Sequence, residues 1–401
     1  MNILFLNIGP ANPLIGGVQC VTHKLADYFS SLDHLTYILS ICQTSDYTDN
    51  MQYYMPNPKS VFCDENKKFL MNFINDRHID IVMNQTCLEP QFCDFLPSIK
   101  KTGIPIVSVF HNSPYGMYGI NAFPKIYDAV NSKITRALIN QSFHFLFKLK
   151  YGRYLRQILQ YSDKMVMLSD KFINEIMYFT GNKNAEKIIA IPNPLTSSSK
   201  LKGEKENIVL FVGRLSREKG VDKLLEAWSG ICHDEKYKDW KLVIVGDGDI
   251  KGQLEQYAID MKLVNYSFEG FQKPDEYYSK AKIFCMASRF EGFGLVLVEA
   301  MSYGVVPLAF NSFPNCSDII DGNENGILVT PFVVSEYRTK LAALMNDNDR
   351  LKTMSASAVN KSRIFSIEKI GAKWLYLFSM LINNSKYNLS LIHISEPTRP
   401  Y

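Results

Sequence analysis

The chain has 401 residues, of which 46% are hydrophobic and 21% are charged, and its formal net charge is +4. This composition is typical of a folded globular protein and argues against a disordered chain. The small net charge gives no reason to expect nucleic-acid binding. The length favours two domains, because a single hydrophobic core rarely grows beyond roughly 250–300 residues.

The eight cysteines are scattered and never form a Cys-x-x-Cys pair. Such usage favours a reducing compartment over a disulfide framework. Residues 1–6 carry no basic segment and too short an apolar run for a signal peptide. No stretch reaches 18 apolar residues, so no transmembrane helix is expected. We therefore predict a cytoplasmic protein.

The first half of the chain predicts alternating strands and helices. The apolar run Ile3–Gly9 indicates a buried parallel strand, and Gly16-Gly17 then leads into a helical pattern. No Gly-x-Gly-x-x-Gly follows this strand, which disfavours a dinucleotide oxidoreductase. Further strands are expected at Leu35–Ile41, Ile79–Met83, Ile104–Phe110 and Lys164–Leu168.

A change of composition marks a linker between two halves. Two prolines, a serine run and several charges follow one another between Ile191 and Glu206. The alternation then restarts, with strands expected at Ile208–Gly213, Lys241–Gly246, Tyr266–Phe268, Ile283–Met286 and Val305–Ala309. The pattern predicts an α/β protein with a Rossmann-like parallel domain over 1–195, a linker over 196–206, a second such domain over 207–365 and a last helix over 366–386.

Two further segments have an unusual character. Residues 131–160 interleave lysines and arginines with aromatic residues and contain no acidic residue. Such a helix suits an anionic membrane surface, and equally a core helix with a basic edge. Residues 389–401 resemble the translation of a sequencing adaptor, so we expect this tail to be non-native and leave it out of functional reasoning.

The most informative stretch is Ser288–Ala300. Its two carboxylates, Glu291 and Glu299, flank the glycines Gly292 and Gly294, and an apolar helical run begins at the second glycine. Glycines allow a sharp turn with a close approach of the backbone, and a helix N-terminus favours an anion such as phosphate. Glu291 in the loop before this helix and Glu299 about one turn inside it could hold sugar hydroxyls beside that phosphate.

Cations follow the first strand of the second half. Arg214 and Lys219 lie in the loop Gly213–Gly220, and carboxyl ends of parallel strands are where such folds bind ligands. Arginine and lysine here suit a diphosphate. His111 follows a strand of the first half in the same way. The sequence Asp247-Gly248-Asp249 looks like a metal motif, but its place after Val245-Gly246 fits a strand-end turn better.

The order of these motifs resembles the signature of retaining glycosyltransferases of family 4, whose GT-B fold has two Rossmann-like domains facing a central cleft. The resemblance rests on Gly213-Arg214-Leu215, Lys219-Gly220, Val245-Gly246-Asp247-Gly248, Glu291-Gly292-Phe293-Gly294, Glu299-Ala300-Met301, Gly304–Pro307 and Asn325–Val329. It covers residues 1–385 and is weaker in the first half. Around Ser312–Ile320 the chain departs from the family pattern, so no site residue is assigned there.

The resemblance implies roles for particular residues of the second domain. Arg214 and Lys219 would neutralise the nucleotide diphosphate, and Glu291 would hold hydroxyls of the donor sugar. Backbone N–H groups of Phe293, Gly294 and Leu295 would lie near sugar and phosphate. Glu299 would bind the ribose, and Phe271 lies where the family meets the base.

In the first domain, Gly17 would let its loop approach the diphosphate, and His111 would face the donor sugar. The last helix would cross back to this domain.

The resemblance implies a retaining, metal-independent hexosyltransferase that needs no cofactor and uses a nucleotide sugar, namely a UDP-sugar. Its acceptor would be a lipid-linked glycan or a polysaccharide in capsule, O-antigen, lipopolysaccharide or exopolysaccharide synthesis, at the inner face of the cell membrane. Transfer could proceed through a covalent carboxylate intermediate or by same-face displacement, and the sequence favours neither. A GT-B sugar-nucleotide epimerase and a non-catalytic sugar-nucleotide-binding protein are the alternatives.

Overall fold

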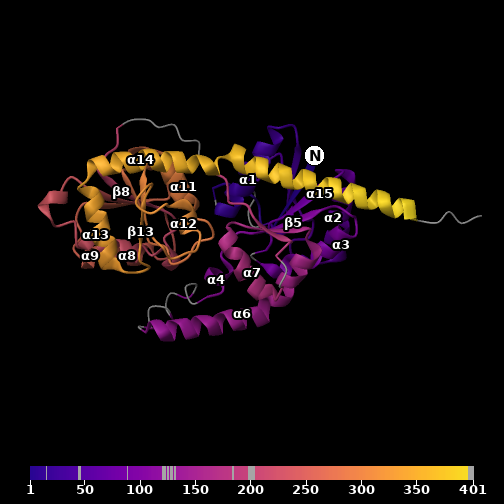
Figure 1. Ribbon diagram of the computed structural model, residues 1–401, viewed down its shortest axis with the longest axis horizontal. Coiled ribbons are helices and arrows are strands. Elements are labelled where there is room, and N and C mark those ends of the chain that lie inside the picture. Colours follow the sequence, from indigo (N-terminus) through magenta and orange to yellow (C-terminus); the bar gives the residue numbers. More distant parts are fainter. Residues whose placement is uncertain are drawn as a thin grey trace, which may run out of the picture. The chain divides into compact units, whose positions relative to one another are not determined.

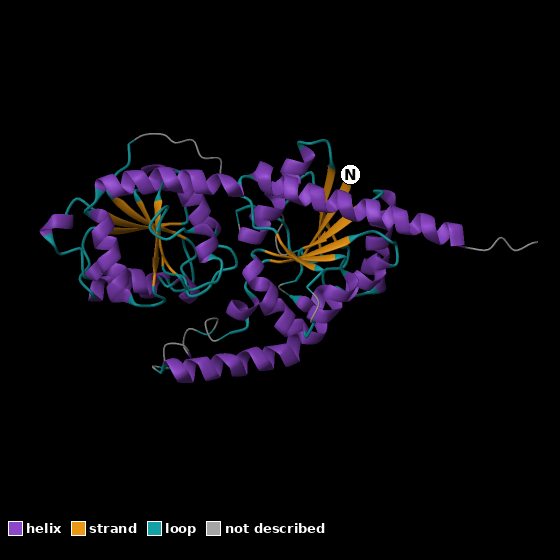
Figure 2. Ribbon diagram, in the orientation of Figure 1, coloured by secondary structure: helices purple, strands orange, loops and turns teal. Residues whose placement is uncertain are grey.

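The computed structural model describes residues 1–395 except 15, 44–46, 88, 120–122, 124, 125, 127–129, 131, 183, 184 and 197–203. It divides into two compact units, each built on its own parallel sheet. Unit 1 comprises residues 1–112, 145–194 and 367 onward, and unit 2 comprises residues 113–144 and 195–366. Figure 2 shows each sheet flanked by helices. The predicted fold class, two parallel α/β domains, is confirmed.

Unit 1 holds a seven-stranded sheet in the order β3-β2-β1-β4-β5-β6-β7. Its strands are β1 (Asn2–Asn7), β2 (Leu35–Ser40), β3 (Gln52–Tyr54), β4 (Ile81–Asn84), β5 (Ile106–Phe110), β6 (Lys164–Met167) and β7 (Ile188–Ala190). Its helices are α1 (Gly17–Ser30), α2 (Asp64–Asp76), α3 (Leu96–Lys100) and α7 (Ile173–Thr180), together with α15 (Ile367–Ser395). The central strands are buried on both faces, as expected for a parallel sheet between helices.

Unit 2 holds a six-stranded sheet in the order β10-β9-β8-β11-β12-β13. Its strands are β8 (Ile208–Val212), β9 (Lys241–Val245), β10 (Tyr266–Gly270), β11 (Ile283–Met286), β12 (Val306–Phe310) and β13 (Ile327–Val329). Its helices are α8 (Val221–Ser229), α9 (Lys251–Asp260), α10 (Asp275–Lys280), α11 (Leu295–Ser302), α12 (Cys316–Ile319), α13 (Val334–Met345) and α14 (Asn348–Ser362). The strand order reverses between β8 and β11, and ligands of such sheets bind at the carboxyl ends beside this switch point.

The last helix, α15, packs against the first helix, α1 (Figure 1). A Cβ atom on Gly371 would lie 2.2 Å from the ring of Tyr28, so glycine permits this close approach. The rings of Phe29 and Phe378 add an edge contact, with centroids 5.8 Å apart. The helix runs to Ser395, beyond the predicted end at residue 386 and through part of the tail expected to be non-native. Residues 396–401 of that tail lie outside the described residues.

Residues 113–144 differ from the sequence-based division, which placed them in the first domain. The short helix α4 (Pro114–Met117) packs beside the glycine loop of unit 2, because a Cβ atom on Gly116 would lie 3.2 Å from the Cβ atom of Phe290. The long helix α6 (Lys133–Tyr161) continues from this segment into unit 1. It covers nearly all of the basic stretch 131–160, of which residue 131 lies outside the described residues.

Candidate functional site

Two loops of unit 2 meet at the carboxyl ends of β8 and β11. Gly220 has a φ of 65°, and a Cβ atom there would lie 2.1 Å from the carbonyl oxygen of Ala287. The Arg289 backbone N–H donates to the Glu218 carbonyl over 2.7 Å, and the buried Arg289 guanidinium donates to the Arg217 carbonyl over 3.2 Å. The loop carrying the predicted cations is therefore fastened to the loop carrying the first predicted carboxylate.

Lys219 and Glu291 are in direct contact at this junction. The Lys219 Nζ atom lies 2.7 Å from the Glu291 Oε1 atom. The Ser288 hydroxyl donates to the same oxygen over 2.7 Å. No partner is recorded for the Glu291 Oε2 atom within the described part of the chain. The ammonium and hydroxyl groups thus fix the carboxylate and leave one oxygen available to a ligand.

Arg214 lies at the start of the same loop but takes no part in this contact. Its side chain is 72% exposed, and its guanidinium lies 3.6 Å from the Glu218 carboxylate. The loop is held against the neighbouring strand end, because the Leu215 N–H donates to the Asp247 carbonyl over 2.8 Å. Arg214 is consequently an exposed guanidinium on an anchored loop, with several N–H donors that suit a phosphate.

The glycine loop leads into α11, whose N-cap is Gly294 with a φ of 85°. The Phe293 ring is buried and packs edge-on against Phe365, with centroids 5.5 Å apart, so only its backbone faces a ligand. Buried Asn315 donates to the Phe293 carbonyl over 3.2 Å. Its own carbonyl oxygen has no partner among the described residues. Asn315 therefore braces the turn from a region where the sequence assigned no site residue.

Glu299 lies one turn inside α11, and each of its two carboxylate oxygens already accepts a hydrogen bond within the protein. The Thr196 hydroxyl donates to its Oε1 atom, and the Tyr278 hydroxyl donates to its Oε2 atom over 3.2 Å. Burial raises the pKa of this carboxyl above its usual value, while these two hydrogen bonds oppose the shift. In its predicted role, Glu299 would accept a hydrogen bond from a ribose hydroxyl. In the structure the Thr196 hydroxyl donates to this carboxylate instead.

We expect Glu299→Gln to leave the fold intact and to lower nucleotide affinity by about tenfold, the usual cost of a lost charged hydrogen bond. The raised pKa means that the ionised carboxylate costs folding free energy above that pKa, and that this cost disappears as the carboxyl is protonated at low pH. Glu299→Gln should thus match or exceed the wild-type melting temperature at neutral pH, with the difference vanishing in acid.

Calorimetric titration with UDP and melting curves across pH check both expectations, and Glu324→Gln, on an exposed loop residue, is the matched control. A Gln variant that melts well below wild type at neutral pH would show that ionised Glu299 stabilises the fold.

Phe271 follows the carboxyl end of β10, and its side chain is 68% exposed. An exposed aromatic ring offers a surface on which a nucleotide base could stack. Leu295, the first residue of α11, is partly buried. Its backbone N–H belongs to the first turn of the helix, where N–H groups lack intrahelical partners.

The two predicted site residues of unit 1 lie at carboxyl ends of its sheet or just beyond. His111 follows β5 and is buried, and burial lowers its pKa to about 4, so the imidazole is neutral at physiological pH. Its Nε2 atom is hydrogen bonded to Gln85. Gly17 is the first residue of α1, preceded by an extended Gly16.

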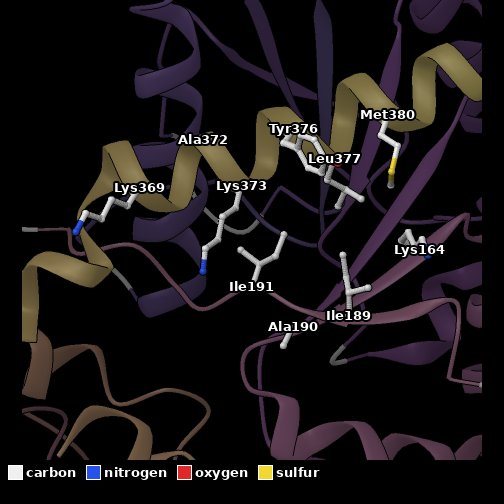
Figure 3. A pocket seen from close by; sticks show the side chains of 10 residues that line it. All are labelled: Lys164, Ile189, Ala190, Ile191, Lys369, Ala372, Lys373, Tyr376, Leu377 and Met380. Atoms are coloured by element: carbon white, nitrogen blue, oxygen red, sulfur yellow. The ribbon is translucent and has the colours of Figure 1, made fainter.

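A separate groove of about 620 Å³ lies in unit 1 between β7 and α15 (Figure 3). Its apolar wall comes from Ile189, Ile191, Leu377 and neighbouring residues, and Lys164, Lys369 and Lys373 also line it. No predicted site residue lines this groove. Apolar walls with ammonium groups suit an anionic group carried on an apolar chain.

Neither a metal centre nor a membrane span is found in the described ranges. No group of three His, Cys, Asp or Glu side chains there is placed to hold a metal ion. Among those same residues, every helix is too short or too polar to cross a bilayer. None of the eight cysteines, all of which lie in the described ranges, forms a disulfide.

Comparison with known proteins identifies the second half of the chain. The family model for glycosyl transferases group 1 matches residues 194–361. An uncharacterized glycosyltransferase of Haemophilus influenzae is 31% identical over 241 residues, which cover 58% of this chain and 67% of the relative. An α-1,4-N-acetyl-D-galactosaminyltransferase of Campylobacter jejuni, which acts on an undecaprenol-linked glycan, is 29% identical over 59% of this chain and 66% of its own length. The matches thus span about two thirds of each relative.

A likeness in fold extends over nearly all of the chain. The pneumococcal O-GlcNAc transferase GtfA, solved with UDP and GlcNAc, superposes with a TM-score of 0.70 at 15% identity, covering 95% of this chain and 99% of that one. At this identity the likeness shows the fold alone. Together with the relative at 31% identity, these findings show that the chain belongs to the glycosyl transferases group 1 family and has the GT-B fold.

Proposed function

We propose that this protein is a retaining, metal-independent glycosyltransferase that transfers a sugar from a UDP-sugar to a lipid-linked glycan or polysaccharide. The observation that carries the proposal is the contact between Lys219 and Glu291, which joins a phosphate-binding cation to a hydroxyl-binding carboxylate at one strand edge. The chain's similarity to an enzyme that extends an undecaprenol-linked glycan supports the class of acceptor. Synthesis of capsule, O-antigen or another surface polysaccharide is the corresponding process.

The chemistry follows from the charge that develops during transfer. Breaking the glycosyl–phosphate bond leaves negative charge on the departing diphosphate, and preorganised cations lower the barrier at that point. We assign this role to Lys219 and the exposed Arg214, with the N–H groups of Phe293–Leu295 at the start of α11 beside them. These groups supply the positive charge for which other transferases use a metal ion.

Glu291 would accept hydrogen bonds from hydroxyls of the donor sugar. An ion pair with Lys219 makes a carboxylate a weaker nucleophile, so we favour same-face displacement over a covalent intermediate on Glu291. In that reaction the acceptor oxygen bonds to the anomeric carbon as the bond to the phosphate breaks, and the leaving phosphate takes the acceptor's proton. We propose that His111 contacts the donor sugar, that Gly17 admits the diphosphate and that Phe271 stacks on the base.

A time course of the reaction by proton NMR tests this mechanism. We expect the first product to carry the anomeric configuration of the donor, and turnover to persist in EDTA. Inversion of configuration, or loss of activity in EDTA that Mg²⁺ restores, would contradict the proposal. An epimerase would instead return a free or nucleotide-linked sugar of altered configuration without an acceptor.

We further propose that the protein binds the inner membrane surface peripherally through residues 131–160. Ile134, Leu138, Phe145 and Leu149 on α6 are exposed and recur at intervals that place them on one face of the helix. The same helix carries cationic residues at Arg136, Lys148, Lys150, Arg153 and Arg156, and the segment has no acidic residue. An exposed apolar stripe with cations suits an anionic lipid surface.

Reversing charge at Lys148, Lys150 and Arg153 to Glu should abolish most binding to vesicles containing phosphatidylglycerol, since each cation near such a surface contributes about 1 kcal/mol. Leu138→Ser with Leu149→Ser should weaken binding independently of salt. Co-sedimentation measures both effects. The controls are the reversal of exposed Lys238, Lys241 and Lys352 and the replacement Ile259→Ser. Equal binding by control and α6 variants would contradict membrane docking through this helix.

A further inference from the structure

Three polar side chains lie buried at the carboxyl ends of three neighbouring strands of unit 1. Asn7 ends β1, Gln85 follows β4 and His111 follows β5, and their exposed fractions are 3%, 3% and 6%. Strands β1, β4 and β5 are adjacent in the sheet. The register pairs Leu6 with Asn84, which sets Asn7 beside Gln85. The backbone N–H of Gln85 donates to the backbone carbonyl of Leu6 over 2.9 Å.

Each of these side chains keeps one buried polar atom without a partner among the described residues. The unpartnered atoms are Asn7 Oδ1, Gln85 Nε2 and His111 Nδ1. The contact recorded within the cluster joins the Gln85 Oε1 atom to the His111 Nε2 atom. Buried polar groups are nearly always paired, so three orphans in one place call for a specific cause.

The layer of polar residues immediately below shows what a purely structural arrangement looks like. The Asn84 amide donates to the Ser108 hydroxyl over 2.9 Å, and the Ser108 and Ser162 hydroxyls lie 2.7 Å apart. The side-chain Oδ1 atom of Asn84 accepts from the Thr86 hydroxyl over 2.8 Å. This layer satisfies itself within the protein. The layer at the strand ends does not, which is the pattern expected of groups reserved for a ligand.

The chemistry of the orphans selects the ligand. Asn7 offers an acceptor, Gln85 offers a donor, and no cation belongs to the cluster. The Asn7 Oδ1 atom and an unprotonated His111 Nδ1 atom are both acceptors, and they would repel a phosphate or carboxylate. Each hydroxyl of a sugar, in contrast, can both donate and accept a hydrogen bond. The cluster is therefore complementary to neighbouring hydroxyl groups and not to the diphosphate.

We propose that Asn7, Gln85 and His111 form a sugar-hydroxyl subsite, and that Gln85 is a positioning residue that holds His111 in the tautomer protonated on Nε2. The identity of the ligand as a sugar rests on the proposed function, whereas the tautomer does not. The Gln85 carbonyl oxygen accepts the Nε2–H bond, so the lone pair of Nδ1 remains to accept a hydrogen bond from a hydroxyl. Burial keeps the imidazole neutral, as the lowered pKa of His111 indicates. Asn7 Oδ1 accepts from a second hydroxyl, and Gln85 Nε2 donates to either.

The tautomer can be measured in the free protein by nitrogen NMR of the full chain labelled at histidine, with His111→Asn identifying the His111 signals. We expect wild type to carry the proton on Nε2. Gln85→Leu should shift His111 to the Nδ1 tautomer or to a mixture, and Gln85→Glu, which keeps the acceptor, should retain the Nε2 tautomer. Ser162→Ala is the structural control, expected to lower the melting temperature without altering the tautomer.

Kinetics then identify the sugar. Gln85→Leu and Asn7→Ala should each raise KM roughly three- to tenfold, the effect of a lost hydrogen bond, while the Kd for UDP alone stays unchanged. A rise in the KM of the donor places the subsite on the donor sugar, and a rise in the KM of the acceptor places it on the acceptor sugar.

A wild-type proton on Nδ1, or a tautomer indifferent to Gln85→Leu, would overturn the positioning role whatever the activity. Unchanged KM for both substrates in Asn7→Ala and Gln85→Leu would overturn the subsite. The expected tautomer without any transfer activity would instead count against the proposed function alone.

Discussion

Replacing Lys219 by alanine should lower kcat by about 10²–10³-fold, the typical loss when one preorganised contact to a developing negative charge is removed. The fold should be retained, because Lys219 is a partly exposed loop residue whose recorded side-chain partner is Glu291. The Lys219 and Glu291 side chains are 22% and 12% exposed, so loss of their ion pair should lower the melting temperature somewhat, although the Ser288 hydroxyl still donates to the Glu291 carboxylate. The effect should fall on turnover and much less on the melting temperature.

The test separates charge from geometry. Lys219→Arg keeps the charge but not its position, so it should recover only part of the lost turnover. Glu291→Gln should also impair transfer while the Ser288 hydroxyl still holds the side chain in place. Lys223→Ala, in the following helix, where the lysine lies near Asp222 and Glu226, is the matched control. Full activity in both Lys219→Ala and Glu291→Gln would remove this cluster from the catalytic site.

Gly220→Ala should destabilise unit 2 by about 2–5 kcal/mol and abolish donor binding. A left-handed conformation costs a residue with a Cβ atom roughly 1–2 kcal/mol, and forcing an atom into a packed site typically costs 1–3 kcal/mol more. At Gly220 the φ is 65°, and the added carbon would lie 2.1 Å from the Ala287 carbonyl oxygen. The loop would have to move away from β11, taking Lys219 from Glu291.

Gly252→Ala provides the matched control for this prediction. Gly252 lies in α9, and among the described residues no atom outside the adjoining helix backbone lies within 4 Å of its added Cβ position. Alanine in a helix is more stable than glycine by roughly 0.5–1 kcal/mol, so this variant should melt slightly higher than wild type. Chemical denaturation with fluorescence detection measures both variants. A Gly220→Ala protein that unfolds like wild type would refute the close approach of the two loops.

Much of the fold follows from simple patterns in the sequence. Apolar runs such as Ile208–Val212 and Ile283–Met286 are long enough and clearly bounded by turn residues, and they became central strands. The edge strands β3, β7 and β13 were not predicted, because a run of three residues is too short to carry a periodic signal. The extent of α15 was underestimated, because its pattern weakens after Leu381.

The contact between Lys219 and Glu291 follows from topology, since both loops leave neighbouring strands of a parallel sheet at the same edge. The bracing residues Arg289 and Asn315 could not be foreseen, because their partners are backbone carbonyls distant in the sequence. Gln85 could not be foreseen either, because the sequence does not show that its buried Nε2 atom lacks a hydrogen-bond partner among the described residues. No sequence pattern indicates that the Thr196 hydroxyl donates a hydrogen bond to the Glu299 carboxylate.

The most direct test of the account is transfer itself. The purified full chain would be incubated with a panel of nucleotide diphosphate sugars, with and without a lipid-linked glycan acceptor, while nucleoside diphosphate release and glycan mass are followed together. The account predicts acceptor-dependent release of UDP from one donor, matched by the addition of one sugar and lost in Glu291→Gln. Tight binding of a sugar nucleotide that is never turned over with any acceptor, or turnover that Glu291→Gln leaves unchanged, would contradict it.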